Sequence, residues 1–184
     1  APHKGLHAPQ GVGALLVGDR AKAALRPILY GGTGTASDEL SQPADFPDGF
    51  EAGTLPGPAI AGLCAALCRC EREGYKDREI INELSLRLRR GLYSIDGVKI
   101  LSPENALSGI VAFNVRDYDS GEVADILSSE YDICVRAGLH CAPLAHKYLG
   151  TLGRGAVRVS LGYNNTLREV DFFLRAVGEI AGKR

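Results

Sequence analysis

The sequence predicts an α+β fold from about residue 59 onward. Two stretches, 59–74 and 77–93, carry apolar residues at the three- and four-residue spacing of an amphipathic helix. Short apolar segments follow them, separated by polar gaps of hairpin length. Helices followed by short, closely spaced strands are typical of an α+β domain.

The first residues predict only short elements. Residues 13–17 form an apolar run between glycines, which is typical of a buried strand. Asp19 is a candidate cap for a short helix over 20–25, which Pro27 would end.

The segment 30–58 is rich in Gly, Thr, Ser, Asp and Pro, and predicts a long loop. A loop of that length usually carries function. Residues 1–58 therefore hold too little regular structure for a domain of their own, and we expect them to be the end of a larger one. We place the domain boundary between residues 58 and 59.

The later elements follow in order along the chain. Gly74 is expected to end the first helix of 59–74. Asp119 or Ser120 is expected to cap one later helix, and Thr166 and Glu169 form a capping box for the last. The predicted elements after residue 93 are strands 98–101 and 109–115, a helix 120–129, strands 133–135 and 156–160, and a helix to about 182.

Charge and hydropathy exclude several functions. Lys and Arg number 21 against 22 Asp and Glu, which gives a net charge of −1 without a block of like charge. Nucleic acids and anionic membranes select basic patches, so neither is an expected partner. No apolar run approaches the ~20 residues that span a bilayer, and the first residues lack the apolar core of a signal peptide. We expect a cytoplasmic protein.

Five cysteines cannot all pair, which favours reduced thiols. Cys64 and Cys68 lie one helical turn apart among apolar neighbours, and Cys134 lies in a predicted strand, so all three are expected in the core. Cys70 falls outside the apolar face and is expected to be exposed. Since their spacing lacks the paired ligand sets of structural zinc sites, we expect no metal.

Two reactive side chains stand in Gly/Pro loops. Lys4 lies in a tight loop before an apolar run, where desolvation favours the neutral amine that Schiff-base chemistry needs. Cys141 follows Arg136 and His140, an electropositive setting that favours a nucleophilic thiolate. The alternatives are a solvated loop lysine and a small core cysteine.

Two further side chains are candidates for binding anions. Arg158 alternates with Val157 and Val159, so it points away from their face, and its planar fork suits a carboxylate. An edge-strand charge in solvent is the alternative. Thr54 follows the flexible Gly53 and offers a hydroxyl to a phosphate.

Together these residues resemble class V, fold-type I pyridoxal-phosphate enzymes, and among them the cysteine desulfurases and selenocysteine lyases. The matching motifs cover essentially the whole chain: PHKGL at 2–6 with GVGAL at 11–15, FEAGT at 50–54, VRAGLHCAP at 135–143 and RVSLGYNNT at 158–166. The resemblance implies that residues 59–184 form the small C-terminal domain of such an enzyme, with a short antiparallel sheet and helices. Residues 1–58 would end its large α/β domain.

The resemblance also implies a cofactor. Lys4 would be the catalytic lysine that binds pyridoxal 5'-phosphate covalently, with His3 beside the cofactor. Thr54 would reach the phosphate of the cofactor in the neighbouring subunit, which implies a homodimer. In that family the remaining cofactor contacts precede the lysine, so we expect this chain alone to retain the cofactor weakly and to turn over little.

For the substrate, the resemblance implies that Arg158 holds the α-carboxylate of L-cysteine, with Arg136 in support. Cys141 would accept the sulfur as a persulfide and pass it to a sulfur-acceptor protein. Selenocysteine lyase or aminotransferase activity is an alternative within the same class. A cofactor-free assembly or interaction role is an alternative of another kind.

Overall fold

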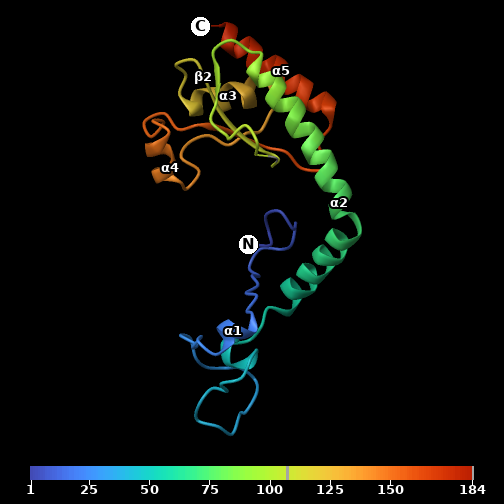
Figure 1. Ribbon diagram of the computed structural model, residues 1–184, viewed down its shortest axis with the longest axis vertical. Coiled ribbons are helices and arrows are strands. Elements are labelled where there is room, and N and C mark those ends of the chain that lie inside the picture. Colours follow the sequence, from blue (N-terminus) through green and yellow to red (C-terminus); the bar gives the residue numbers. More distant parts are fainter. Residues whose placement is uncertain (107, 184) are drawn as a thin grey trace. The chain divides into compact units, whose positions relative to one another are not determined.

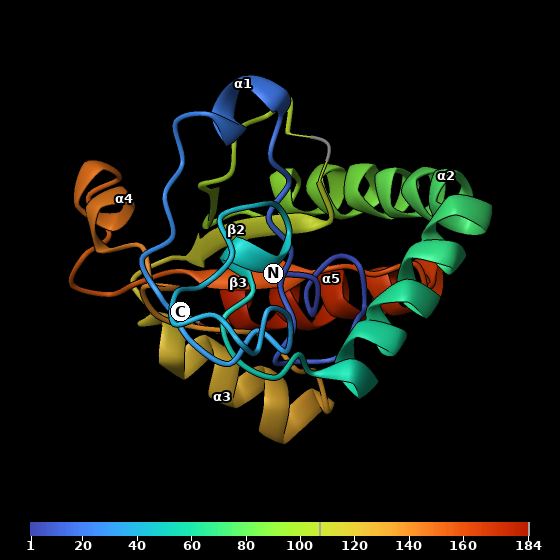
Figure 2. The same cartoon turned by 90° about the horizontal axis from the view of Figure 1, so that it is seen from below.

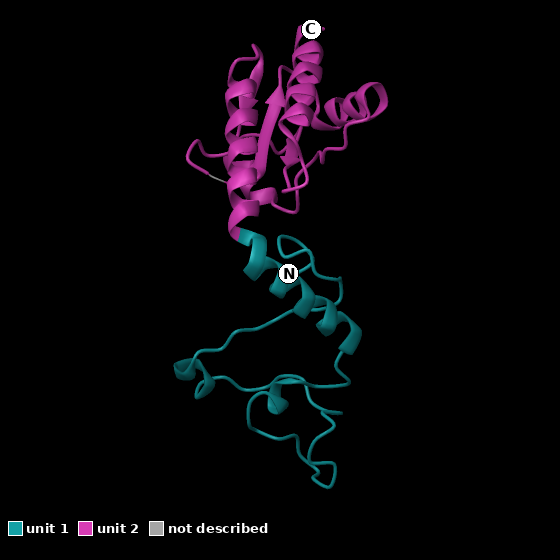
Figure 3. Ribbon diagram, turned by 90° about the vertical axis from the view of Figure 1, so that its right-hand side faces the viewer, with its two compact units in different colours: residues 1–74 teal, residues 75–184 magenta. Residues whose placement is uncertain are grey.

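The computed structural model describes residues 1–106 and 108–183. Contacts within the chain divide it into unit 1, Ala1–Gly74, and unit 2, Tyr75–Arg184 (Figure 3). The division falls inside helix α2 (Gly57–Tyr93), so each unit contains part of that helix. The expected domain boundary at residue 58 concerns a longer protein and stays a prediction.

Unit 1 is mostly irregular. Its elements are helix α1 (Asp19–Lys22), the 3-10 turn η1 (Asp48–Phe50) and the beginning of α2 (Figure 1). Helix α1 is shorter than predicted, and Gly18 rather than Asp19 is its cap. The strand predicted at 13–17 is wrong: Leu15 and Leu16 are 77% and 95% exposed. An apolar run forms a strand only beside a partner strand, and the described part of unit 1 has none.

The predicted long loop at 30–58 is confirmed as irregular apart from η1 and the first residues of α2. Its two ends are held together, because the Gly53 N–H donates to the Gly31 carbonyl at 2.8 Å. The Gly31 N–H donates in turn to the Gln42 side chain at 2.7 Å. These bonds place Thr54 directly after a closed loop.

Helix α2 is continuous, so the predicted break at Gly74 is wrong. A glycine inside a helix costs only about 1 kcal/mol, and no proline follows it to prevent continuation. The second half of the pattern is confirmed, since Leu84, Leu88 and Leu92 are buried.

A three-stranded antiparallel sheet forms the centre of unit 2, in the order β1-β2-β3. The strands are β1 (Val98–Ile100), β2 (Ile110–Val115) and β3 (Val157–Ser160), close to the predicted segments. Phe113 of β2 pairs with Val157 of β3, and one isolated antiparallel bridge joins Arg158 of β3 to Arg136, which lies outside the named strands. The expected α+β class is therefore confirmed.

One hydrophobic core holds unit 2 together. Helix α3 (Ser120–Tyr131) packs against β2 and β3, and α5 (Leu167–Gly182) packs against α3 and β2 (Figure 2). Phe113 meets Phe173 edge-to-face with ring centroids 6.0 Å apart. Fully buried side chains from five elements meet here: Leu88, Leu92, Phe113, Leu127, Val157, Val177 and Ile180.

The predicted caps of α3 and α5 are confirmed, because both helices begin with complete capping boxes, at Asp119 and at Thr166. The strand predicted at 133–135 is wrong. There the left-handed Asp132 ends α3, and the Ile133 N–H bonds back to Leu127 instead of to a neighbouring strand. The sequence also gave no indication of the short helix α4 (Pro143–Tyr148).

None of the helices in the described ranges combines the length and apolar character needed to cross a bilayer.

Candidate active site

The loop that carries Cys141 lies in unit 2, between the Arg136–Arg158 bridge and α4. The Ala142 N–H donates to the Leu139 carbonyl at 2.8 Å and closes a turn. Cys141 stands within this turn with a φ of +60°, and its residue is exposed. Since Pro143 then begins α4, the thiol lies on a short loop with structure on both sides.

Two arginines face each other beside this loop. Arg136 and Arg158 exchange both backbone hydrogen bonds, at 3.2 and 2.7 Å, so their side chains leave the bridge on the same face. An Arg136 Nη2 donates to the Cys141 Sγ at 3.8 Å. The Nε of Arg158 is buried and has no hydrogen-bond partner in the described structure. Two guanidinium groups in this arrangement fit a carboxylate.

A histidine neighbours the thiol, but it does not add positive charge. Burial of the ring lowers the pKa of His140 below its ordinary value of 6.5. Its bond to the Ala156 carbonyl opposes this shift, while the charges of Arg158 and Arg136 lower the pKa further. At neutral pH the ring is therefore mostly neutral, and the positive potential at Cys141 comes from arginine.

Helix α4 is anchored by a histidine that we did not single out as functional. His146 is buried, and its Nδ1 lies 2.8 Å from the Thr151 hydroxyl. The Thr151 N–H also donates to the His146 carbonyl at 2.9 Å. This pair fixes the segment that follows Cys141. The sequence does not predict this contact, because a histidine five residues before a threonine is a common pattern.

In unit 1, Lys4 lies in a compact loop at the start of the chain. The Ala8 N–H donates to the Pro2 carbonyl and the His7 N–H to the Lys4 carbonyl, both at 3.1 Å. In the loop that these bonds close, Pro2 and Ala8 are buried, whereas His3 and Lys4 are exposed. Within the described residues Lys4 makes no ion pair, so its amine is open to an aldehyde-bearing cofactor such as pyridoxal phosphate.

Thr54 is exposed and follows Gly53, whose φ of +88° only glycine adopts easily. In the described part of unit 1, no hydrogen bond connects Thr54 to His3 or Lys4. The structure thus brings Arg136, Cys141 and Arg158 together, while no hydrogen bond in the described residues links Thr54 to Lys4.

The expectation of a buried Cys64, Cys68 and Cys134 is wrong, because all five cysteines are free and exposed, Cys70 as predicted. Helical spacing predicts an apolar face on α2 but not a partner for it, and Ile60 and Leu67 on this face are exposed as well.

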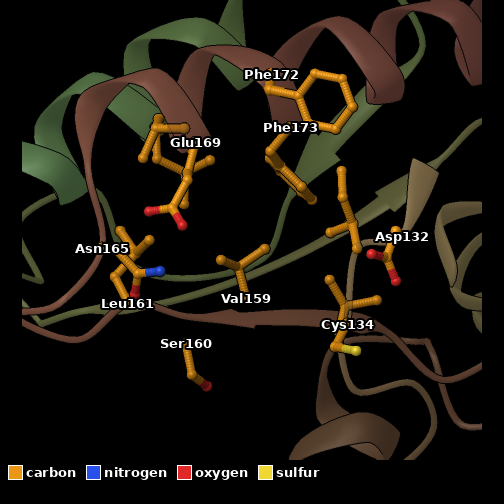
Figure 4. A pocket seen from close by; sticks show the side chains of 13 residues that line it. Asp132, Cys134, Val159, Ser160, Leu161, Asn165, Glu169, Phe172 and Phe173 are labelled. Carbon is orange, nitrogen blue, oxygen red and sulfur yellow. The ribbon is translucent and has the colours of Figure 1, made fainter.

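Cys134 lies instead at a pocket of about 280 Å³ in unit 2 (Figure 4). Val159, Phe173 and other apolar side chains line one part of it, while Asn165 and Glu169 of the α5 capping region line another. The pocket does not include Cys141.

Comparison with known proteins identifies the sequence pattern. The family model described as Aminotransferase class-V matches residues 1–173. A probable cysteine desulfurase from Methanothermobacter thermautotrophicus is 35% identical over 189 residues, covering 98% of this chain and 46% of the relative. One from Pseudomonas putida is 37% identical over 190 residues, covering 96% of this chain and 43% of the relative.

Solved structures show the same fold. The apo cysteine desulfurase of Thermococcus onnurineus superposes with a TM-score of 0.87 at 33% identity, over 100% of this chain and 46% of that one. The cysteine desulfurase CsdA of Escherichia coli, in an S-sulfonic acid form, gives a TM-score of 0.79 at 27% identity, over 97% and 44%. The chain spans less than half the length of these relatives.

Proposed function

The chain belongs to the class-V aminotransferases, a family of pyridoxal-phosphate enzymes, and we propose that it contributes the sulfur-accepting site of a cysteine desulfurase-like enzyme. The observation that supports this most directly is the exposed Cys141 thiol, 3.8 Å from the Arg136 guanidinium and beside Arg158. A thiol on an exposed loop beside a cation is suited to nucleophilic attack.

In the proposed reaction the Cys141 thiolate attacks the sulfur of L-cysteine. The new S–S bond forms as the Cβ–S bond of the substrate breaks, and the substrate carbon keeps the electron pair and takes up a proton. The products are alanine and a persulfide on Cys141. The substrate has lost its sulfur to Cys141 and has gained one proton, the equivalent of the proton that the Cys141 thiol gave up. Because Cys141 is exposed, a sulfur-acceptor protein reaches the persulfide from solvent.

Arg158 binds the α-carboxylate of the substrate, and Arg136 supports it. Their side chains leave the same face of the bridge, so one carboxylate lies within reach of both. Arg136 also contacts the thiol, which places the attacking sulfur close to the bound amino acid.

The residues of unit 1 fit the cofactor. Lys4 supplies an exposed amine for the aldehyde of pyridoxal phosphate, and its Nζ then moves the substrate α-proton. When bound, the cofactor supplies an electron sink for negative charge at the substrate carbon. His3 lies next to Lys4, and Thr54 offers a hydroxyl to the phosphate of a neighbouring subunit in a homodimer.

We further propose a cytoplasmic enzyme, with residues 1–58 ending its large domain and 59–184 forming its small domain. Since these relatives are more than twice as long as their matched part, this chain alone retains the cofactor weakly and is nearly inactive.

Replacing Cys141 with Ala tests the sulfur-accepting role. In a full-length enzyme that contains this chain, we expect Cys141→Ala to lower L-cysteine-dependent alanine and sulfide formation by about a thousandfold, as loss of a nucleophile does. Cys134→Ala is the matched control, because Cys134 is also exposed in unit 2. Unchanged alanine formation in Cys141→Ala would refute the role of the thiol, because the Cβ–S bond of the substrate would then break without it.

Borohydride trapping tests the role of Lys4 in this chain itself. After incubation with pyridoxal phosphate and reduction, we expect one phosphopyridoxyl group on the peptide that contains Lys4. Lys22 is the internal control, since its amine is paired with Asp19 at 3.0 Å. Equal labelling of both lysines would mean that Lys4 has no selective affinity for the cofactor.

A further inference from the structure

The backbone of the cysteine loop is held in a conformation that its residues do not favour. His140 and Cys141 both have positive φ, at +52° and +60°, and neither is glycine. Side chains with a Cβ crowd the following carbonyl in this left-handed region, so such residues occur singly and need support. Two in succession at a functional thiol require an interaction that fixes them.

The His140 side chain supplies that interaction. Its Nε2–H donates to the Ala156 carbonyl at 2.9 Å, across from the loop. Ala156 itself is buried, and its N–H donates to the Gly138 carbonyl at 3.1 Å. The ring therefore connects the residue before the thiol to a fixed point at the beginning of β3.

The groups around the His140 ring determine which of its nitrogens carries the proton. Arg136 and Arg158 face it with their charges, and His146 lies with its ring centroid 5.8 Å away. In the described structure the Nδ1 atom is buried and has no hydrogen-bond partner. The neutral ring carries its proton on Nε2, where the carbonyl accepts it, so His140 is a neutral donor rather than a proton acceptor for Cys141.

We propose that His140 is a positioning residue for Cys141: its bond to Ala156 holds the left-handed pair 140–141 and keeps the thiol within reach of Arg136. The proposal matters for catalysis only if Cys141 accepts sulfur as proposed above. Its test does not depend on that role. A residue with a merely structural role would affect the whole of unit 2, whereas a positioning residue affects one thiol.

Alkylation of individual cysteines tests the proposal in the complete chain without cofactor or substrate. Iodoacetamide modification is followed by peptide mass spectrometry, and the rate at Cys141 is divided by the rate at Cys134. His140→Gly takes up the positive φ without strain and removes the side chain with its bond to the Ala156 carbonyl. His140→Gln keeps an amide N–H at similar reach.

We expect His140→Gly to lower the Cys141/Cys134 rate ratio about two- to fivefold, which is the range that the loss of one net hydrogen bond supports. His140→Gln should restore the ratio to within about twofold of the original chain. The Cys134 rate should stay unchanged, because Cys134 lines a pocket to which His140 does not contribute.

Two results would overturn the proposal. A His140→Gly ratio equal to that of the original chain would mean that the bond to Ala156 does not position the thiol. A lowered ratio that His140→Gln fails to restore would mean that something other than the donated hydrogen bond is responsible. Both outcomes are independent of whether Cys141 accepts sulfur, which the activity of Cys141→Ala decides separately.

Discussion

At the scale of single residues, the Arg136–Arg158 pair works against stability. Like charges directly opposite each other across a bridge repel, and the backbone bonds fix them in that position. Chains usually avoid such a pair unless an anion lies between the two charges. The pair is thus better explained by ligand binding than by folding.

This gives a stability prediction for the free chain. Arg136→Ala should raise the free energy of unfolding by up to about 1 kcal/mol, because it removes the repulsion across the bridge. Urea denaturation in a buffer without carboxylates measures the change. Arg175→Ala, which removes an exposed charge from α5, is the control and should change stability by less than about 0.5 kcal/mol. A loss of stability in Arg136→Ala would show that the arginine is structural.

Sequence reasoning reached these residues unequally. Arg158 is predictable because alternation with two valines fixes its face, and Cys141 because its loop composition is distinctive. The direct pairing of Arg136 with Arg158 depends on a bridge across 22 positions, outside any predicted strand pairing. Likewise the neutral state of His140 depends on burial, which the sequence does not contain.

At the scale of elements, the contact between α2 and α5 depends on one glycine. A Cβ at Gly91 would overlap the nearest methyl group of Leu174, which is buried in the core. The two helices therefore approach each other here more closely than any other residue would permit.

Two alanine substitutions separate this packing effect from helix propensity. Gly91→Ala should destabilise the chain by about 1–3 kcal/mol, because Leu174 must move out of its place. Gly178→Ala in α5 meets nothing within 4 Å and should stabilise the chain by about 0.5–1 kcal/mol. Thermal unfolding of both variants measures the difference, and equal effects would contradict the close packing.

The capping box of α5 predicts a pH dependence. Bonds from the Thr166 backbone and hydroxyl lower the pKa of Glu169 below its ordinary value of 4.5. A lowered pKa in the folded state means that the charged carboxylate stabilises the fold above pH 4.5, and that this contribution is lost as the pH falls through the folded value.

Unfolding of Glu169→Gln across pH tests this dependence. Since glutamine also forms capping boxes, the variant removes only the charge, and its deficit in stability should be largest near neutrality and vanish in acid. Glu83→Gln, on the exposed side of α2, should show no such dependence. A deficit that stays constant down to strongly acidic pH would exclude a role of the carboxylate charge.

Local signals explain which elements were predictable. Each capping box consists of contacts within four consecutive residues, so α3 and α5 begin where the sequence predicts. The continuity of α2 through Gly74 and the absence of a strand at 13–17 depend on what lies elsewhere in space, and local patterns predict both incorrectly.

At the scale of the whole molecule, the two units differ in how they are stabilised. Unit 2 buries a core shared by a sheet and three helices. Unit 1 exposes large apolar side chains along irregular segments, among them Leu16, Ile28 and Leu40. Local stability follows buried contacts, so it should be unevenly distributed along the chain.

Hydrogen exchange measures this difference directly. Amides of β2 and α5 should exchange about a thousandfold or more slowly than those of 31–47, because core amides open only with global unfolding. Peptide-level mass spectrometry resolves both regions in one experiment. Similar exchange in the two units would mean that unit 1 has a core of its own.

The attachment of the cysteine loop has a consequence for protein engineering. Hydrogen bonds at Arg136 and Gly138 fasten one side of the loop to β3, and the buried His146–Thr151 pair fastens the other side. Inside residues 139–142 the His140 side chain adds a third attachment through the Ala156 carbonyl, so residues inserted after Cys141 would extend the loop and leave all three attachments in place. The length of the loop can thus be changed while the sheet and helices of unit 2 are kept.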